Sequence, residues 1–257
     1  SRSGSDFTPF YQHLAIPSLN VGFGGEDGGG SYHSNFDSYD HYARFGDPGF
    51  HYGIALAKVA GRLTLRLANA EILPFRFANF AGTVEEYVDE IDKLTERMRK
   101  ETEEKNRNIR EGIFLAAADP KEPFVAPNEE ASVPHLELAA LRNGAAKLRR
   151  SADAFDAARH LAADKPMTPE KAERVNAILR RLERTLSSDE GLPRRPWFRH
   201  LIYAPGFYTG YGVKTLPGVR EAIEQREWRE AEAEAKRIGA ALERFAAALD
   251  EATAALK

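Results

Sequence analysis

The feature that most constrains the fold is a helical spacing of apolar residues, which begins near residue 79 and recurs through most of the remaining chain. Thr83 and Glu86 stand three residues apart, as in a capping box, and predict the start of a first helix. A third helix is predicted to begin at Thr168, and the last to follow Pro217. The faces predicted to point inward are Val84, Tyr87, Val88, Ile91, Leu94 and Met98 in the first helix; Leu138, Leu141, Ala145, Leu148, Ala152 and Phe155 in the second; Val175, Ile178, Leu179, Leu182 and Leu186 in the third; and Ile238, Leu242, Phe245, Leu249 and Leu256 in the last. Four such helices predict an antiparallel bundle.

Residues 1–78 differ in composition, with short elements rich in glycine and aromatic residues. Ile16 to Phe23 and Ile72 to Phe75 are predicted to be buried strands. Between them, Asp47 and Pro48 are typical of a helix start, and a helix is predicted from about Gly49 to Asn69. Its apolar residues lie nearly all round it, which favours a helix that covers a sheet. The predicted fold class is therefore an α/β remnant in residues 1–78 followed by an all-α helical bundle in residues 79–257.

Composition excludes several classes of function. Lysine and arginine number 36 against 39 aspartate and glutamate residues, and the net charge of -3 gives no general attraction to nucleic acid or anionic membranes. No stretch approaches the roughly 18 consecutive apolar residues of a membrane-spanning helix. The chain has no cysteine, so any metal ion has to be held by histidine and carboxylate side chains.

A loop at residues 28–50, GGGSYHSNFDSYDHYARFGDPGF, contains the residues best suited to chemistry. His33 suits a zinc ligand, although a lone loop histidine is more often an ordinary hydrogen-bonded side chain. Tyr32 is suited to donating a hydrogen bond to an oxyanion, and equally to packing its ring under the loop. Asp37 and Asp40 are suited to orienting His33 or to facing solvent. The sequence shows no HExxH motif and no histidine pair at ligand spacing, so a complete zinc site is not expected within this chain.

Six strings, in order, carry a resemblance to a known family: SGSDFTPF, IPSLN, YHSNFDSYDHYARFGDP, LANAEILPF, GLPRRPWFRHLIYAP and TLPGV. Together they resemble the C-terminal third of glutamate carboxypeptidase II-type zinc peptidases, whose architecture the transferrin receptor shares. The resemblance implies that residues 1–78 are the C-terminal part of the zinc peptidase domain and residues 79–257 a transferrin receptor-like helical dimerisation domain. It also implies two zinc ions in the complete protein, a homodimer through the helical domain, a peptide substrate and an extracytoplasmic location.

The same resemblance assigns roles to the two loop residues. His33 matches the last zinc ligand in chain order, and Tyr32 matches the donor that stabilises the oxyanion of a tetrahedral intermediate. The other zinc ligands and the general base would precede Ser1. The chain by itself is therefore expected to be inactive and to bind zinc only weakly.

On the substrate side, the resemblance places Ser3, Gly4 and Ser5 along the cleft, with Ser5 standing where glutamate-cleaving relatives have asparagine. Asn20 and Gly22 replace two arginines that favour an acidic side chain ahead of the scissile bond in those relatives. An acidic preference is therefore not expected for this chain.

Tyr211 matches a family tyrosine that binds the terminal carboxylate of the substrate, whereas Gly210 replaces its lysine partner. Lys214 is the residue available to compensate. From the residue alone, Tyr211 is equally a loop aromatic packed at the seam between domains. The segment GLPRRPWFRHLIYAP is interpreted as an extended stretch that pins the helical domain onto the peptidase domain, with His200 in a structural role.

Three functions remain open on this evidence. The first is the C-terminal portion of a di-zinc exopeptidase that acts on small peptides. The alternatives are a non-catalytic receptor-like or assembly protein on the same fold, and a free-standing helical dimerisation module. The presence of both Tyr32 and His33 favours the enzyme.

Overall fold

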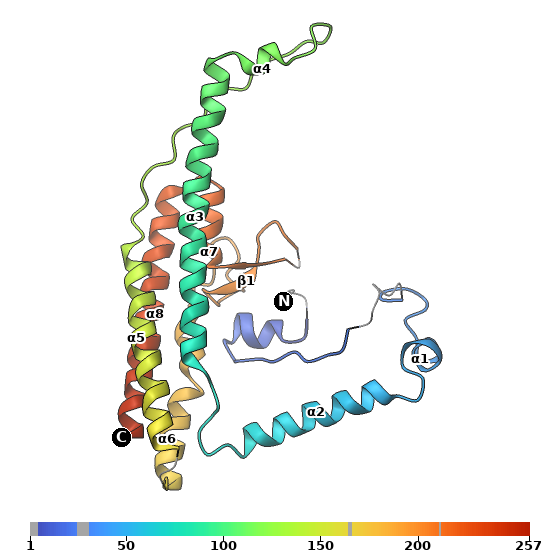
Figure 1. The fold of residues 1–257 in the computed structure, drawn as a ribbon, viewed down its shortest axis with the longest axis vertical. Coiled ribbons are helices and arrows are strands. Elements are labelled where there is room, and N and C mark those ends of the chain that lie inside the picture. Colours follow the sequence, from blue (N-terminus) through green and yellow to red (C-terminus); the bar gives the residue numbers. More distant parts are fainter. Residues whose placement is uncertain (1–4, 25–30, 164–165, 211) are drawn as a thin grey trace. The chain divides into compact units, whose positions relative to one another are not determined.

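A computed structural model describes residues 5–24, 31–163, 166–210 and 212–257. The chain divides into two compact units, one of residues 18–75 and the other of the residues before Ser18 together with residues 76–257. Helices dominate both units (Figure 1). The proposed division into a peptidase part, 1–78, and a dimerisation part, 79–257, stays a prediction.

The larger unit is built on long helices. Its helical elements are η1 (Pro9–His13), α3 (Phe77–Arg110), α4 (Ile113–Ala116), α5 (Ala139–Ala162), α6 (Pro169–Leu179), η3 (Leu182–Leu186), α7 (Pro217–Glu224) and α8 (Trp228–Leu256). Two short strands, β1 (Tyr203–Pro205) and β2 (Val213–Thr215), pair antiparallel with Ala204 opposite Lys214. The predicted helix-dominated fold is therefore confirmed.

The core lies where α5 and α8 pack against each other. Leu141, Leu148 and Phe155 on α5 are fully buried, as are Leu242 and Leu249 on α8. The faces predicted from apolar spacing therefore form the core of this unit, because burying such a stripe is what stabilises an amphipathic helix.

Two glycines allow α5 and α8 to approach closely. A Cβ atom added to Gly239 would lie 2.4 Å from the carbonyl oxygen of Ala140, and one added to Gly144 would lie 2.7 Å from the carbonyl oxygen of Gly239. Both distances are to backbone atoms, so neither side chain can be accommodated without separating the helices. This close contact was not predicted from the sequence.

The predicted antiparallel arrangement is wrong for one pair of helices. Gly144 lies against Gly239, and Ala158, further along α5, lines a cavity together with Leu256 at the end of α8, so α5 and α8 run in the same direction (Figure 1). The long connection between them includes α6 and the β1–β2 pair and returns the chain to the starting end. By contrast, α3 is antiparallel to α5.

Charged contacts fix this antiparallel packing. The Arg149 guanidinium lies 2.7 Å from the Glu85 carboxylate, and the Arg142 guanidinium lies 2.7 Å from the Asp92 carboxylate. The order of these pairs along α3 is the reverse of their order along α5.

Helix ends were the least accurate predictions. The capping box at Thr83 is wrong, because α3 begins at Phe77 and the Thr83 hydroxyl donates to the Asn79 carbonyl within the helix. The carboxylate of Asp156 on α5 instead accepts a hydrogen bond from the Ala78 amide, 3.3 Å away. The helix start is thus satisfied by a residue distant in sequence, which no local motif reveals.

Two other predicted helices are shorter than expected. The third helix begins at Pro169, with the Thr168 hydroxyl accepting from the Lys171 amide as predicted, but it ends at Leu179 and is followed by η3. The last helix is divided between α7 and α8 at Arg226, which has a φ of 60°. The Arg226 guanidinium donates to the hydroxyl of Thr102, 2.7 Å away, which holds this break against α3.

The smaller unit contains α1 (Tyr39–His41), η2 (Tyr42–Gly46) and α2 (His51–Ala68). The predicted cap and first turn at Asp47 and Pro48 are displaced, because α2 begins at His51 and Phe50 is its N-cap residue. The Asp47 carboxylate still accepts from amides of the first turn, those of Tyr52 at 3.2 Å and Gly53 at 2.8 Å. Burial alone would raise the pKa of Asp47, but these amide hydrogen bonds hold the pKa below its usual value.

The two predicted strands of the α/β remnant are wrong. Neither Ile16 to Phe23 nor Ile72 to Phe75 is a strand. The Ile16 amide donates to the Phe10 carbonyl, and the Phe75 amide donates to the Leu73 carbonyl. Both hydrogen bonds join residues that are close in sequence, so they form local turns and not strand pairing. Apolar spacing indicates burial in a sheet, but a strand also requires a neighbouring strand to pair with.

Candidate functional site

The predicted catalytic pair lies on a short turn in the smaller unit. The Ser34 hydroxyl donates to the Ser31 carbonyl at 2.7 Å and accepts from the Phe36 amide at 3.2 Å, which closes the turn around Tyr32 and His33. The rings of Tyr32 and His33 are stacked, with centroids 3.9 Å apart and planes inclined by 21°. The Tyr32 side chain is 80% exposed and His33 is also exposed.

The backbone of His33 adopts an uncommon conformation. Its φ of 60° lies in the left-handed region, which disfavours residues other than glycine, although histidine is tolerated there more often than most. In the described part of the chain, no hydrogen bond engages either ring nitrogen, so both nitrogens are accessible to a metal ion or another ligand.

A zinc ion would need more ligands than this turn provides. Structural and catalytic zinc sites use at least three protein side chains. Within residues 5–24, 31–163, 166–210 and 212–257, no cluster of three or more metal-binding side chains is present. Asp40, predicted as a residue that might orient His33, instead lies 3.8 Å from the Arg44 guanidinium. A zinc ion at His33 would therefore need further ligands besides those of this turn.

The predicted substrate-binding residues are only partly described. Ser5 is exposed in the larger unit, and its carbonyl accepts from the Thr8 amide at 2.9 Å. Asn20 is exposed in the smaller unit. Ser3, Gly4 and Tyr211 lie outside the described residues. The structure thus brings Tyr32 and His33 together, and the substrate-binding assignments stay predictions.

His200 anchors the segment that the sequence analysis singled out for its arginine and aromatic residues. Its Nδ1 accepts from the amides of Ile202 and Tyr203 at 3.2 and 3.3 Å, so the ring proton is on Nε2, which lies 2.9 Å from a Glu183 carboxylate oxygen. The ring of Tyr11 stacks on His200 with centroids 4.5 Å apart. Burial, followed by the charge of Glu183, raises the pKa of the Tyr11 phenol.

The same segment, residues 191–205, contacts residues near the beginning of the described chain. The Gln12 carbonyl accepts from the amides of Arg199 at 2.8 Å and His200 at 3.1 Å. The His13 ring stacks on Trp197, and its Nδ1 lies 2.7 Å from the Trp197 carbonyl. The segment therefore consists mainly of turns and bends that contact η1, and the prediction of an extended stretch is correct only for β1, Tyr203–Pro205.

A buried ion pair supports the loop at residues 206–212. Arg195 and Glu221 form an ion pair with side chains 10% and 8% exposed. Glu221 also accepts from the Phe207 amide at 2.6 Å, and Arg195 donates to the Pro205 carbonyl. Sequence reasoning missed this pair, because its members are 26 residues apart and carry no local signal.

Gly210 stands where the family resemblance places a lysine, and its backbone conformation explains why a glycine fits there. Gly210 has a φ of 57°, a conformation that a lysine would adopt only with strain. Lys214, expected to compensate for that lysine, forms an ion pair with Glu224. Compensation would therefore require this pair to break.

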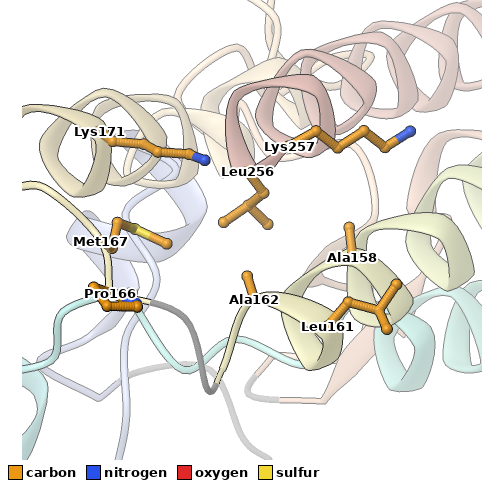
Figure 2. A pocket seen from close by; sticks show the side chains of 8 residues that line it. All are labelled: Ala158, Leu161, Ala162, Pro166, Met167, Lys171, Leu256 and Lys257. Carbon is orange, nitrogen blue, oxygen red and sulfur yellow. The ribbon is translucent and has the colours of Figure 1, made fainter.

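A cavity of about 270 Å³ lies where the end of α5, the start of α6 and the end of α8 meet (Figure 2). Its lining is mostly apolar, with two lysines: Ala158, Leu161, Ala162, Pro166, Met167, Lys171, Leu256 and Lys257. None of the described residues that were predicted to bind zinc or substrate lines it. Among the described residues, no helix is long and apolar enough to span a membrane.

Comparison with known proteins gives one family match and several relatives. Residues 136–250 match the transferrin receptor-like dimerisation domain. The chain is 34% identical over 225 residues to a probable glutamate carboxypeptidase of Arthroderma benhamiae, a match that covers 86% of this chain and 26% of the relative. A probable glutamate carboxypeptidase of Arabidopsis thaliana is 30% identical over 223 residues, with 86% and 26% covered.

A more distant relative is an aminopeptidase of Rattus norvegicus. It is 25% identical over 265 residues, which cover 98% of this chain and 31% of the relative. The chain thus spans about a quarter of the length of the two carboxypeptidase relatives and slightly more of the aminopeptidase.

Proposed function

We propose that this chain is the C-terminal portion of a di-zinc exopeptidase. The chain is related to glutamate carboxypeptidase-type peptidases and carries a transferrin receptor-like dimerisation domain, as its sequence predicted. In this proposal it contributes one zinc ligand, residues of the substrate cleft and the dimerisation domain. The substrate is a small peptide, and the reaction is hydrolysis of a peptide bond.

The observation that carries the proposal is the exposure of side chains in the smaller unit. It displays the stacked Tyr32 and His33 rings at its surface, while α2 contains no buried residue. Apolar side chains of α2 such as Ile54, Val59 and Leu65 are 49%, 52% and 63% exposed. A helix with this much exposed apolar surface requires a cover, and the sheet of a complete peptidase domain would provide one.

In the complete enzyme, His33 would be one of several ligands of the zinc ions. Bound zinc lowers the pKa of a coordinated water and polarises the scissile carbonyl. The Tyr32 phenol, next to His33 and exposed, would donate a hydrogen bond to the oxyanion that forms when the carbonyl is attacked. The hydroxyl proton stays on Tyr32 throughout this step, because the phenol acts only as a donor.

The substrate contacts in this proposal are the residues that the family resemblance assigned. Ser3, Gly4 and Ser5 line the cleft, and Asn20 lies near the residue ahead of the scissile bond. Tyr211 binds the terminal carboxylate. Because Asn20 and Gly22 carry no positive charge, they would not select an acidic residue at that position.

The helical domain would pair two copies of the protein. The family that residues 136–250 match is a dimerisation domain, which supports a homodimer. The same match favours the second candidate function, a non-catalytic receptor-like or assembly protein, because the matched region is described by dimerisation and not by catalysis.

One experiment distinguishes the peptidase from the receptor-like protein. The natural protein that contains this chain and the purified 257-residue chain would be assayed for peptide hydrolysis with and without a chelator. We expect chelator-sensitive hydrolysis by the natural protein and none by the 257-residue chain. A natural protein that binds no zinc and hydrolyses no peptide would establish the receptor-like alternative instead, and chelator-sensitive hydrolysis by the short chain would refute the division of ligands proposed here.

A further inference from the structure

The cavity at the ends of α5 and α8 combines an apolar lining with positive charge. Among the described residues that line it, none is acidic and two are lysines, Lys171 and Lys257 (Figure 2). The others are apolar: Ala158, Leu161, Ala162, Pro166, Met167 and Leu256. All of them belong to the larger unit, so the cavity does not depend on how the smaller unit is placed. It also takes no part in the proposed peptidase function.

The charge of the two lysines is available to a ligand. Among the residues that the structure describes, none with a carboxylate forms an ion pair with Lys171 or Lys257, whereas Lys105 and Lys214 are paired with Glu130 and Glu224. An ammonium group beside an apolar wall is partly removed from water, so an anion that approaches it gains a charge-assisted hydrogen bond. The cavity therefore favours an anionic ligand.

Lys171 is the lysine that is directed at the cavity. It lies in the first turn of α6, where its amide donates to the Thr168 hydroxyl at 3.3 Å, and its side chain is half-buried. In Figure 2 the Lys171 side chain points toward Leu256, whereas the Lys257 side chain points away from the other labelled residues. One ammonium group directed inward matches a ligand with a single negative charge, and Lys257 adds positive charge at the edge.

The rest of the lining determines what carries that charge. The volume of about 270 Å³ equals that of about nine water molecules at about 30 Å³ each, which suits a ligand of about ten non-hydrogen atoms. Apart from the lysines, the described lining offers no side-chain nitrogen or oxygen. A ligand with a buried peptide group would leave that group without a side-chain partner, which is unfavourable. A plain hydrocarbon chain requires none.

We propose that this cavity is a binding site for a medium-chain fatty carboxylate, with the carboxylate at the Lys171 ammonium and the alkyl chain against the ends of α5 and α8. Octanoate has ten non-hydrogen atoms and is the ligand of matching size. The site belongs to the larger unit alone and is separate from peptide hydrolysis.

The test follows the two methionines of the 257-residue chain, because Met167 lines the cavity and Met98 lies on α3. With isotope-labelled methionine methyl groups, octanoate should shift the NMR signal of Met167 and leave that of Met98 in place. We expect a Kd below about 1 mM, the order attainable by a ligand of about ten non-hydrogen atoms. Affinity should rise about fourfold for each methylene added between butanoate and octanoate, and level off in chains too long for the cavity.

Two variants separate the contribution of the charge from that of the cavity. Lys171→Met keeps the length of the side chain without its charge and should weaken octanoate binding about tenfold or more. Ala162→Phe fills the cavity and should abolish the Met167 shift. Lys236→Met, which removes an exposed lysine elsewhere on α8, is the matched control and should leave the affinity unchanged. None of the three positions is fully buried, so thermal unfolding should show each variant folded like the unmodified protein.

Two further ligands test the proposed chemistry. Octylammonium has the same chain with the opposite charge, and N-acetylleucine has a carboxylate together with an amide group. Each should bind at least about tenfold more weakly than octanoate. The inference is overturned if octanoate does not shift the Met167 signal, if Lys171→Met or Ala162→Phe binds octanoate like the unmodified protein, or if either further ligand binds as tightly. None of these outcomes bears on the proposed peptidase function, which is tested by zinc content and hydrolysis.

Discussion

At the scale of single residues, His33 combines three features. It is exposed, it stacks on an exposed tyrosine, and its backbone lies in the left-handed region. That conformation costs about 1–2 kcal/mol for a residue with a Cβ atom. Strain of this kind concentrates at functional sites, which supports the proposed role of His33 as a zinc ligand.

Gly239 is the residue on which the helical core makes its sharpest prediction. Gly239→Ala would place a Cβ atom 2.4 Å from the Ala140 carbonyl oxygen on α5, and this backbone atom cannot move aside alone. We expect the free energy of unfolding to fall by about 1–3 kcal/mol, as in other overpacked cores. Urea denaturation followed by circular dichroism measures this change.

Gly82→Ala is the control for the helix propensity of alanine. An added Cβ atom at Gly82 would meet the end of the Arg149 side chain at 2.9 Å, and that guanidinium is flexible. Its unfolding free energy should stay the same or rise slightly, because alanine favours helix over glycine. A Gly239→Ala protein as stable as the Gly82→Ala protein would show that α5 and α8 do not touch at this point.

At the scale of elements, the sequence predicted the buried faces of the long helices but not their ends or directions. Leu148 and Leu242 were assigned to the core correctly, because apolar spacing is a local property that repeats along a helix. The start of α3 depends on Asp156, and the direction of α8 depends on a long connection, so neither is encoded within a few residues. The predicted strands failed for a related reason, since a strand depends on its neighbour.

The residues described for the candidate site also differ in how far the sequence alone could reveal them. Tyr32 and His33 could be predicted as candidates because they are adjacent in sequence within a recognisable motif, and the structure stacks their rings. Arg195 and Glu221 were missed because only the folded chain brings them together.

Asp47 makes the start of α2 sensitive to acid. Its pKa is lower in the folded protein than in the unfolded chain, where it is about 3.9, because amide hydrogen bonds favour the charged form. Its stabilising contribution is therefore complete above about pH 4 and is lost as the pH falls through the lower, folded-state pKa. The exchange protection of the Tyr52 and Gly53 amides should decrease over this range.

Asp47→Asn removes the charge and should make the protection of these amides weaker and nearly independent of pH over the same interval. Protection in the unmodified protein that does not change on acidification would mean that the Asp47 carboxylate does not stabilise the first turn of α2.

At the scale of the whole molecule, the two units differ in how completely they bury their apolar residues. The larger unit has a continuous core along α5 and α8, whereas α2 in the smaller unit has no buried residue. This contrast is expected if the larger unit is a dimerisation domain and the smaller unit is one part of a larger peptidase domain.

Self-association is a property of the larger unit in this account. We expect the purified 257-residue chain to sediment as a dimer at micromolar or higher concentration, because it contains the matched dimerisation region, residues 136–250. Sedimentation velocity over a concentration series measures this directly. A single monomeric species at every concentration would contradict dimerisation through this region alone.

The most direct test of the proposed function is the zinc content of the natural protein with and without His33. His33→Ala should reduce the bound zinc by about one ion per subunit and remove most peptide hydrolysis, since a ligand is lost from a catalytic centre. His135→Ala, which alters an exposed histidine of the larger unit, should leave both zinc content and hydrolysis unchanged. Full zinc content and full hydrolysis in the His33→Ala protein would contradict the account.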